Sequence, residues 1–123
     1  MTLIEEAAKI MLAAHQDQKR KTDGSPYIVH PTAVATKLSD LDFDDAVVAA
    51  ALVHDVLEDT DFPEEKLREK LGDEVWTIVK ALSEDQALEW EERKQAYIDT
   101  IAKSSDKIKA VSIVDKIHNL ECL

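Results

Sequence analysis

The segment from Asp44 to Asp59, DDAVVAAALVHDVLED, constrains the fold more than any other part of the chain. Its first half is apolar on almost every side, so a helix formed here offers no face to water and is expected to lie at the centre of the molecule. The longest uninterrupted apolar run, residues 46–53, is far too short to cross a bilayer. The chain is therefore expected to build a globular domain around this helix.

The remaining segments also follow a helical pattern, and none alternates long enough to predict a strand. Thr2 with Glu5 forms a capping box, and Ser105 is placed to start the last helix. The expected helices cover residues 2–15, a segment opening at Pro31, residues 44–59, 63–72, 73–84, 90–103 and a segment from Ser105 whose buried side carries Ile108, Val111, Val114 and Ile117. The pattern predicts an all-α bundle of about seven helices in a single domain, residues 1–123.

Composition excludes several classes of protein. The net charge is −11, and 18 of the 26 acidic residues lie between positions 40 and 92, so neither nucleic acid nor an anionic membrane is expected as a partner. One cysteine cannot form an internal disulfide, and the N-terminus carries Glu5 and Glu6 where a secretory signal needs positive charge. Two glycines cannot build a phosphate-binding loop. These features favour a cytoplasmic protein.

Ionisable residues concentrate at the end of the central helix. His54 and Glu58 are four residues apart on one helix face, and Asp55 and Asp59 are four apart on the neighbouring face. Four such groups within two turns of a buried helix are costly unless they are paired or bind a cation. The alternative is a helix that ends near residue 58, with Glu58 and Asp59 as exposed loop acids and Asp55 as a salt-bridge partner.

The last helix supplies a further acid in an apolar pattern. Asp115 interrupts the pattern, and Asn119 and Cys122 follow at i+4 and i+7 along the same line of the helix. Together with His30 at the start of the second helix and the His54–Asp55 pair, Asp115 completes a set of two imidazoles and two carboxylates. Such a set suits Mn²⁺, Fe²⁺ or Zn²⁺ and leaves coordination positions for water.

These residues amount to a family resemblance. The order His30, His54–Asp55, Asp115 resembles the H…HD…D signature of HD-domain metal-dependent phosphohydrolases. Three blocks, KRKTDGSPYIVHP, AALVHDVLEDT and VDKIHNL, are similar to blocks of the (p)ppGpp hydrolase domain of Rel/Spo-type enzymes and small alarmone hydrolases. The blocks stand in the family's order, and the resemblance covers most of the chain.

The resemblance implies an HD-domain helical bundle and a site for one divalent transition metal, Mn²⁺ in the typical member. It implies that Glu58 and Asp59 orient and deprotonate the attacking water. The implied reaction is hydrolysis of the 3′-pyrophosphate of ppGpp or pppGpp, which releases pyrophosphate and GDP or GTP. The implied metal ligands are His30, His54, Asp55 and Asp115.

The resemblance also implies which residues bind the guanosine polyphosphate. Arg20 matches the residue that lies against the guanine face, Lys21 a residue near phosphate and Asn119 a residue that contacts the ribose. Two departures stand after the HNL motif, where Glu121 and Cys122 replace a basic residue and a small hydroxyl residue. Family members normally continue with further helices, so a C-terminally truncated domain is expected.

Alternatives remain at this point. The chain is either an alarmone hydrolase, an HD phosphohydrolase of another nucleotide such as a 5′-nucleotidase, or a truncated, non-catalytic HD module that binds metal or nucleotide. The residues leave homo-oligomer formation open. His15 and His118 fall outside the ligand signature and are interpreted as structural or surface residues. Tyr27 is expected to pack under its loop, with the pocket mouth as the alternative position.

Overall fold

A computed structural model describes residues 1–122 of the chain, and in this range it has eight α-helices and no strand; a single bridge joins Lys19 to Pro26. The prediction of an all-α bundle is confirmed. The helices are α1 (Leu3–Ala14), α2 (Val29–Asp40), α3 (Asp45–Val53), α4 (Val56–Asp59), α5 (Glu64–Leu71), α6 (Asp73–Leu82), α7 (Trp90–Ala102) and α8 (Asp106–Glu121).

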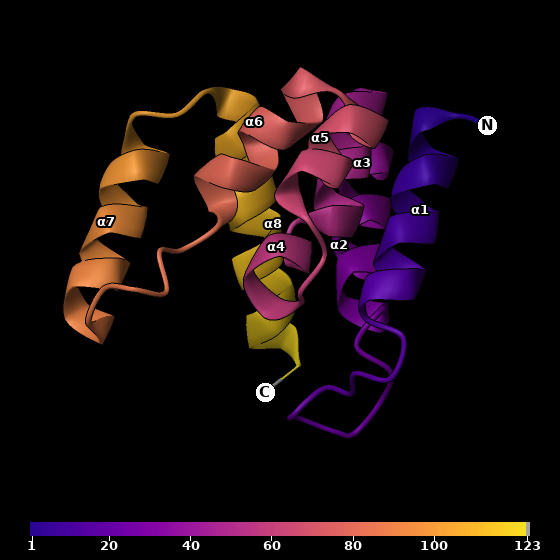
Figure 1. Cartoon of the computed structure of the whole chain (residues 1–123). Coiled ribbons are helices and arrows are strands. Elements are labelled where there is room, and N and C mark those ends of the chain that lie inside the picture. The colour runs from indigo at the N-terminus through magenta and orange to yellow at the C-terminus, as the bar shows by residue number, and fades with distance from the viewer. Residues whose placement is uncertain (123) are drawn as a thin grey trace.

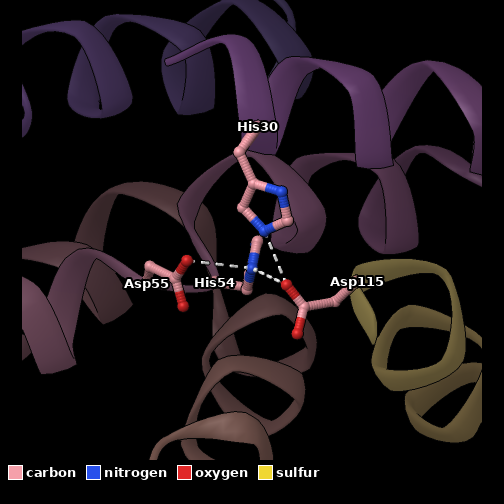
Figure 2. A group of neighbouring side chains, drawn as sticks. All are labelled: His30, His54, Asp55 and Asp115. Carbon is pink, nitrogen blue, oxygen red and sulfur yellow. Dashed lines mark hydrogen bonds and ion pairs between the residues drawn. The ribbon is translucent and has the colours of Figure 1, made fainter. Parts of the chain in front are cut away.

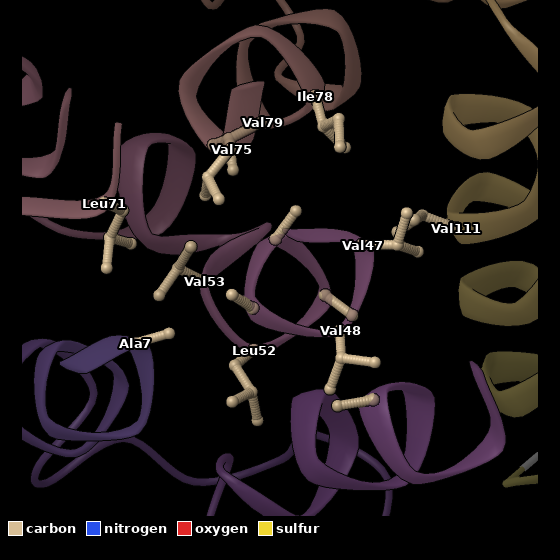
Figure 3. Close-up of a cluster of buried hydrophobic side chains, with 14 of the residues drawn as sticks. Ala7, Val47, Val48, Leu52, Val53, Leu71, Val75, Ile78, Val79 and Val111 are labelled. Atoms are coloured by element: carbon tan, nitrogen blue, oxygen red, sulfur yellow. The ribbon is translucent and has the colours of Figure 1, made fainter. Parts of the chain in front are cut away.

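Helix α3 is the centre of the hydrophobic core. Every residue from Val47 to Val53 is buried, and α3 packs against α1, α2, α6 and α8. Figure 3 shows α3 surrounded by these helices, with Ala7 of α1, Val79 of α6 and Val111 of α8 directed towards it. The sequence-based expectation of a central helix is therefore correct, because no other position buries all of its faces.

Side chains at the predicted caps begin several of these helices. The Thr2 hydroxyl accepts the Glu5 N–H at 3.1 Å, the Asp44 carboxylate accepts the Val47 N–H at 3.1 Å, and the Ser105 hydroxyl accepts the Ile108 N–H at 3.4 Å. Each bond satisfies an N–H that has no acceptor within its own helix. The capping signals at Thr2 and Ser105 placed two of these helix starts correctly, and the start expected near Asp44 is confirmed.

The prediction of the buried face of α8 is partly wrong. Ile108 and Val111 are buried as expected, but Ile117 is 48 % exposed. The buried line continues instead through Ser112 and Asp115, because α8 packs against both α2 and α3. The polar Asp115 is thereby carried into the interior.

One end of the bundle gathers three segments that are distant in the sequence. In Figure 1 the C-terminal end of α8, the short helix α4 and the loop between α1 and α2 all lie at the lower end of the molecule. The loop and α8 are joined there by a hydrogen bond from Arg20 Nη2 to Asn119 Oδ1 (3.4 Å). No helix in residues 1–122 is long and apolar enough to span a membrane.

Candidate metal centre and its surroundings

His30 belongs to the first turn of α2. The helix was expected to open at Pro31, but it begins at Val29, after a turn in which the His30 N–H bonds the Tyr27 carbonyl (3.0 Å). Pro31 is tolerated as the third helical residue because the N–H groups of a first turn have no acceptor within the helix. The turn directs the buried His30 side chain towards α8.

His54 and Asp55 lie at a break between two helices. One continuous helix was expected from residue 44 or 45 to residue 59, but α3 ends at Val53 and α4 begins at Val56. His54 Nδ1 donates to the Ala51 carbonyl at 2.6 Å, while the backbone N–H of His54 makes only a long bond (3.5 Å) to the same oxygen. The imidazole thus competes with the backbone for this acceptor and contributes to ending α3.

Four predicted ligands converge at this break (Figure 2). Each offers one ligand atom, and these atoms all lie within 4.8 Å of one another. Asp115 Oδ1 is 2.6 Å from His30 Nε2 and 3.0 Å from His54 Nε2, and Asp55 Oδ2 is 3.1 Å from His54 Nε2. The converging residues, from α2, the α3–α4 break and α8, are His30, His54, Asp55 and Asp115.

The hydrogen bonds of His54 show that the site fits a cation. A carbonyl oxygen only accepts, so His54 Nδ1 must carry a proton. In the neutral ring Nε2 is then a lone pair that faces two carboxylate oxygens, from Asp55 and Asp115. This arrangement is stable only with a second proton on the ring or with a metal ion among the three groups. A metal would displace that proton.

The pKa values of the clustered residues follow from the same contacts. Burial lowers the pKa of His54, but Asp55 and Asp115 outweigh burial and raise it well above its usual value. Burial raises the pKa of Asp115, but hydrogen bonds from His30 and His54 outweigh burial and lower it. The two aspartates are therefore ionised, as metal ligands must be.

Within residues 1–122, three side chains outside the ligand set bond to it, and the sequence did not assign them to the site. The Tyr27 hydroxyl donates to Asp55 Oδ2, Lys116 Nζ donates to Asp115 Oδ2 at 3.0 Å, and His118 Nδ1 lies 2.7 Å from His30 Nδ1. Tyr27 was expected to pack under its loop, with the pocket mouth as the alternative, and His118 to be a structural or surface residue. For His118 the spacing was an available signal, because it follows Asp115 by three residues on one helix, whereas Tyr27 lies before α2 and has no such signal.

Glu58 is half-buried and Asp59 is exposed, and the two acids line different hollows. Asp59 lines a hollow of about 390 Å³ together with Arg20, Lys21 and Tyr27. Glu58 lines a neighbouring hollow, where its Oε1 accepts the Glu84 N–H at 2.8 Å. Burial, followed by nearby carboxylates, raises the pKa of both acids, although the Glu84 N–H opposes the rise at Glu58.

The predicted nucleotide-binding residues come together on the Asp59 side. Arg20 and Lys21 lie in the loop between α1 and α2, and Arg20 reaches Asn119 on α8. Glu121 lines a separate groove between α2 and α8, away from the hollow with the basic residues. Cys122 Sγ lies 3.6 Å from His118 Nε2. The departure at Glu121 therefore adds no acid to the wall of the Arg20–Lys21 hollow.

A family model described as HD domain matches residues 7–123. The chain belongs to the HD-domain family. It is 39 % identical over 112 residues to the guanosine-3′,5′-bis(diphosphate) 3′-pyrophosphohydrolase MESH1 of Drosophila melanogaster. The match covers 89 % of this chain and 63 % of that protein. It is 37 % identical to human MESH1 over 121 residues, which covers 96 % of this chain and 68 % of the human protein.

A solved structure and a further sequence relative give the same family relationship. A metazoan orthologue of SpoT, described as hydrolysing ppGpp, superposes with a TM-score of 0.91 at 35 % identity, covering 98 % of this chain and 70 % of that chain. A further relative, the guanosine-3′,5′-bis(diphosphate) 3′-pyrophosphohydrolase of Haemophilus influenzae, is 37 % identical, covering 89 % of this chain but 17 % of its own length. The chain thus spans less than two thirds of the length of the Drosophila and Haemophilus relatives.

Proposed function

We propose that this HD domain is a phosphoric ester hydrolase that removes the 3′-pyrophosphate of ppGpp and pppGpp in a Mn²⁺-dependent reaction. The observation that carries the proposal is the juxtaposition of a histidine–aspartate cluster with a basic hollow that also contains an acid, Asp59. Relatives named as hydrolases of this nucleotide support the choice of substrate. The products are pyrophosphate and GDP or GTP.

The four converging side chains would hold the metal. Two imidazole nitrogens and two carboxylates suit Mn²⁺ and other divalent transition metals. The bound ion supplies Lewis acidity and lowers the pKa of a water. His30 can offer an Nε2 lone pair only with its proton on Nδ1, where His118 is the acceptor. Burial, His30 and Arg20 lower the pKa of His118, which keeps that acceptor neutral.

Asp59 is the proposed general base for the attacking water. It lies in the hollow with Arg20 and Lys21, and its raised pKa brings its proton affinity closer to that of a base working near neutral pH. Glu58 is the proposed second member of the pair. The Glu84 N–H holds Glu58 in the neighbouring hollow. We therefore infer that Glu58 helps to orient the attacking water and that Asp59, not Glu58, takes its proton.

Arg20, Lys21 and Asn119 are the proposed nucleotide contacts. The Arg20 guanidinium can stack on a guanine ring, and Lys21, which is exposed, can reach a phosphate. The bond between Arg20 and Asn119 brings a base-binding group next to the proposed ribose-binding group. The basic loop thereby offers positive charge to a polyphosphate even though the chain as a whole is strongly acidic.

The proposal is tested by incubating the protein with ppGpp, GTP and dGMP in the presence of Mn²⁺. Pyrophosphate released from ppGpp alone is the expected result. Release of a nucleoside from dGMP would indicate a 5′-nucleotidase instead, and bound metal without any turnover would indicate a non-catalytic module. Either of these outcomes overturns the proposal.

A variant separates catalysis from metal binding. Asp59→Asn is expected to retain Mn²⁺ and to lower the rate of pyrophosphate release by about 10²–10⁴-fold, the usual contribution of a general base. Asp61→Asn is the matched control, because it makes the same change at an exposed residue two positions further along the chain. Equal rates for both variants would remove Asp59 from the mechanism.

A further inference from the structure

We propose that Tyr27 is a positioning residue of the metal site, whose hydroxyl holds Asp55 in the orientation in which this carboxylate binds the metal. The inference rests on the proposed function, because it concerns the same metal centre. It adds a residue outside the four ligands that sets how tightly the metal is held. The contact that carries it is the hydrogen bond from the Tyr27 hydroxyl to Asp55 Oδ2.

The loop before α2 gives the Tyr27 ring a defined place. The backbone N–H of Tyr27 donates to the Gln18 carbonyl at 2.8 Å, next to the bridge between Lys19 and Pro26. The ring packs against that of His15, with centroids 4.7 Å apart, and His15 is 2 % exposed. His15 is itself anchored, because its Nδ1 lies 2.8 Å from Gln18 Oε1. The hydroxyl is thus presented to Asp55 by a supported ring.

The polarity of this hydrogen bond is fixed. A phenol has an ordinary pKa of about 10, well above neutral pH. The phenol therefore stays protonated, and an ionised carboxylate can only accept. Tyr27 therefore donates and Asp55 accepts wherever the phenol is protonated and the carboxylate is charged.

Asp55 needs such a donor because acids surround it. Asp55 faces Asp115 across the site, and Asp59 follows Asp55 by one helical turn. Without the phenol, His54 is the remaining side chain within residues 1–122 that bonds Asp55. A carboxylate with one partner can rotate about its side-chain bonds, and ordering it again on metal binding costs conformational entropy. Partners of this kind are worth about 10–100-fold in metal affinity.

The test is calorimetric titration of Mn²⁺ into Tyr27→Phe, which removes the hydroxyl and keeps the ring against His15. The dissociation constant is expected to rise by about 10–100-fold. Tyr97→Phe is the matched control, since the Tyr97 hydroxyl lies 2.7 Å from Ser112 Oγ, and its loss is expected to leave the dissociation constant unchanged. At saturating Mn²⁺, Tyr27→Phe is expected to lower kcat for ppGpp, because Asp55 is no longer held in place.

The outcomes separate this inference from the function on which it rests. If the unsubstituted protein binds no Mn²⁺, the proposed metal site is wrong. If it binds Mn²⁺ and Tyr27→Phe binds equally tightly, the metal site stands and the role of Tyr27 is refuted. Each titration is run well below the unfolding temperature measured for that variant in chelator. A mere loss of stability then leaves the dissociation constant unaltered.

Discussion

Helices α3 and α7 are the two extremes of this domain. In α3 all residues from Val47 to Val53 are buried, whereas α7 has no buried residue and packs along α6 and α8 (Figure 1). The composition explains the contrast, because α3 reads DAVVAAALV and α7 reads WEERKQAYIDTIA. Because α3 is packed on every side and α7 is not, α3 can hold neighbouring side chains in fixed positions more firmly than α7 can.

The candidate metal site is built on the buried helix and its neighbours. His54 and Asp55 directly follow α3, and α2 and α8, which bring His30 and Asp115, pack against α3. Helix α7 is attached through polar contacts, such as the ion pair between Lys94 and Glu84 (2.7 Å). A metal site needs ligands held to within about 0.5 Å, which an element packed on every side provides.

The largest expected effect follows from removing a ligand at the end of α3. His54→Ala leaves three of the four ligands and removes the only imidazole that contacts both Asp55 and Asp115 within residues 1–122. We expect no measurable Mn²⁺ in the purified protein and no ppGpp hydrolysis, with metal content read by elemental analysis. Gln16→Ala, a substitution at an exposed position outside the ligand set, is expected to retain metal. Full metal content in His54→Ala would break the link between α3 and the site.

A second prediction compares the two helices in stability. Leu52→Ala, at 6 % exposure in α3, is expected to lower the free energy of unfolding by about 2–5 kcal/mol through the lost contacts and the cavity. Ile98→Ala, at 58 % exposure in α7, is expected to change it by about 0.5 kcal/mol or less. Urea unfolding in chelator measures both. A similar loss in the two variants would mean that α7 is covered in solution.

The smallest effect concerns pH and the acid Glu58 on α4. Burial raises the pKa of Glu58, so its ionised form costs stability in the folded state, and this cost disappears as the pH falls through that raised pKa. Glu58→Gln is expected to raise the unfolding temperature in chelator by about 2 °C or less at pH 8 and to have no effect at pH 4. Glu69→Gln, at an exposed position on α5, is the charge-matched control. A loss of stability at pH 8 would show that the Glu84 N–H outweighs burial.

The sequence predicted which residues cluster at the metal site, but not which residues surround them. His30, His54, Asp55 and Asp115 were selected by residue type and order, and the structure brings all four together. The contacts around them were not predicted, because Tyr27 and His118 reach their partners across 28 and 88 positions of the chain. Patterns within one helix carry no information about which neighbouring element will cover it.

By itself the sequence determined the helical segments, their caps and the central place of α3, because these depend on local spacing and on residues that cannot face water. Only the tertiary structure decided that the helix breaks at His54, where a side chain takes the Ala51 carbonyl, and that Glu58 and Asp59 lie in separate hollows. The physical reason is the distance along the chain over which each interaction acts. Helix formation is settled over a few residues, whereas the direction of a polar side chain is settled by partners that the fold brings from elsewhere in the chain.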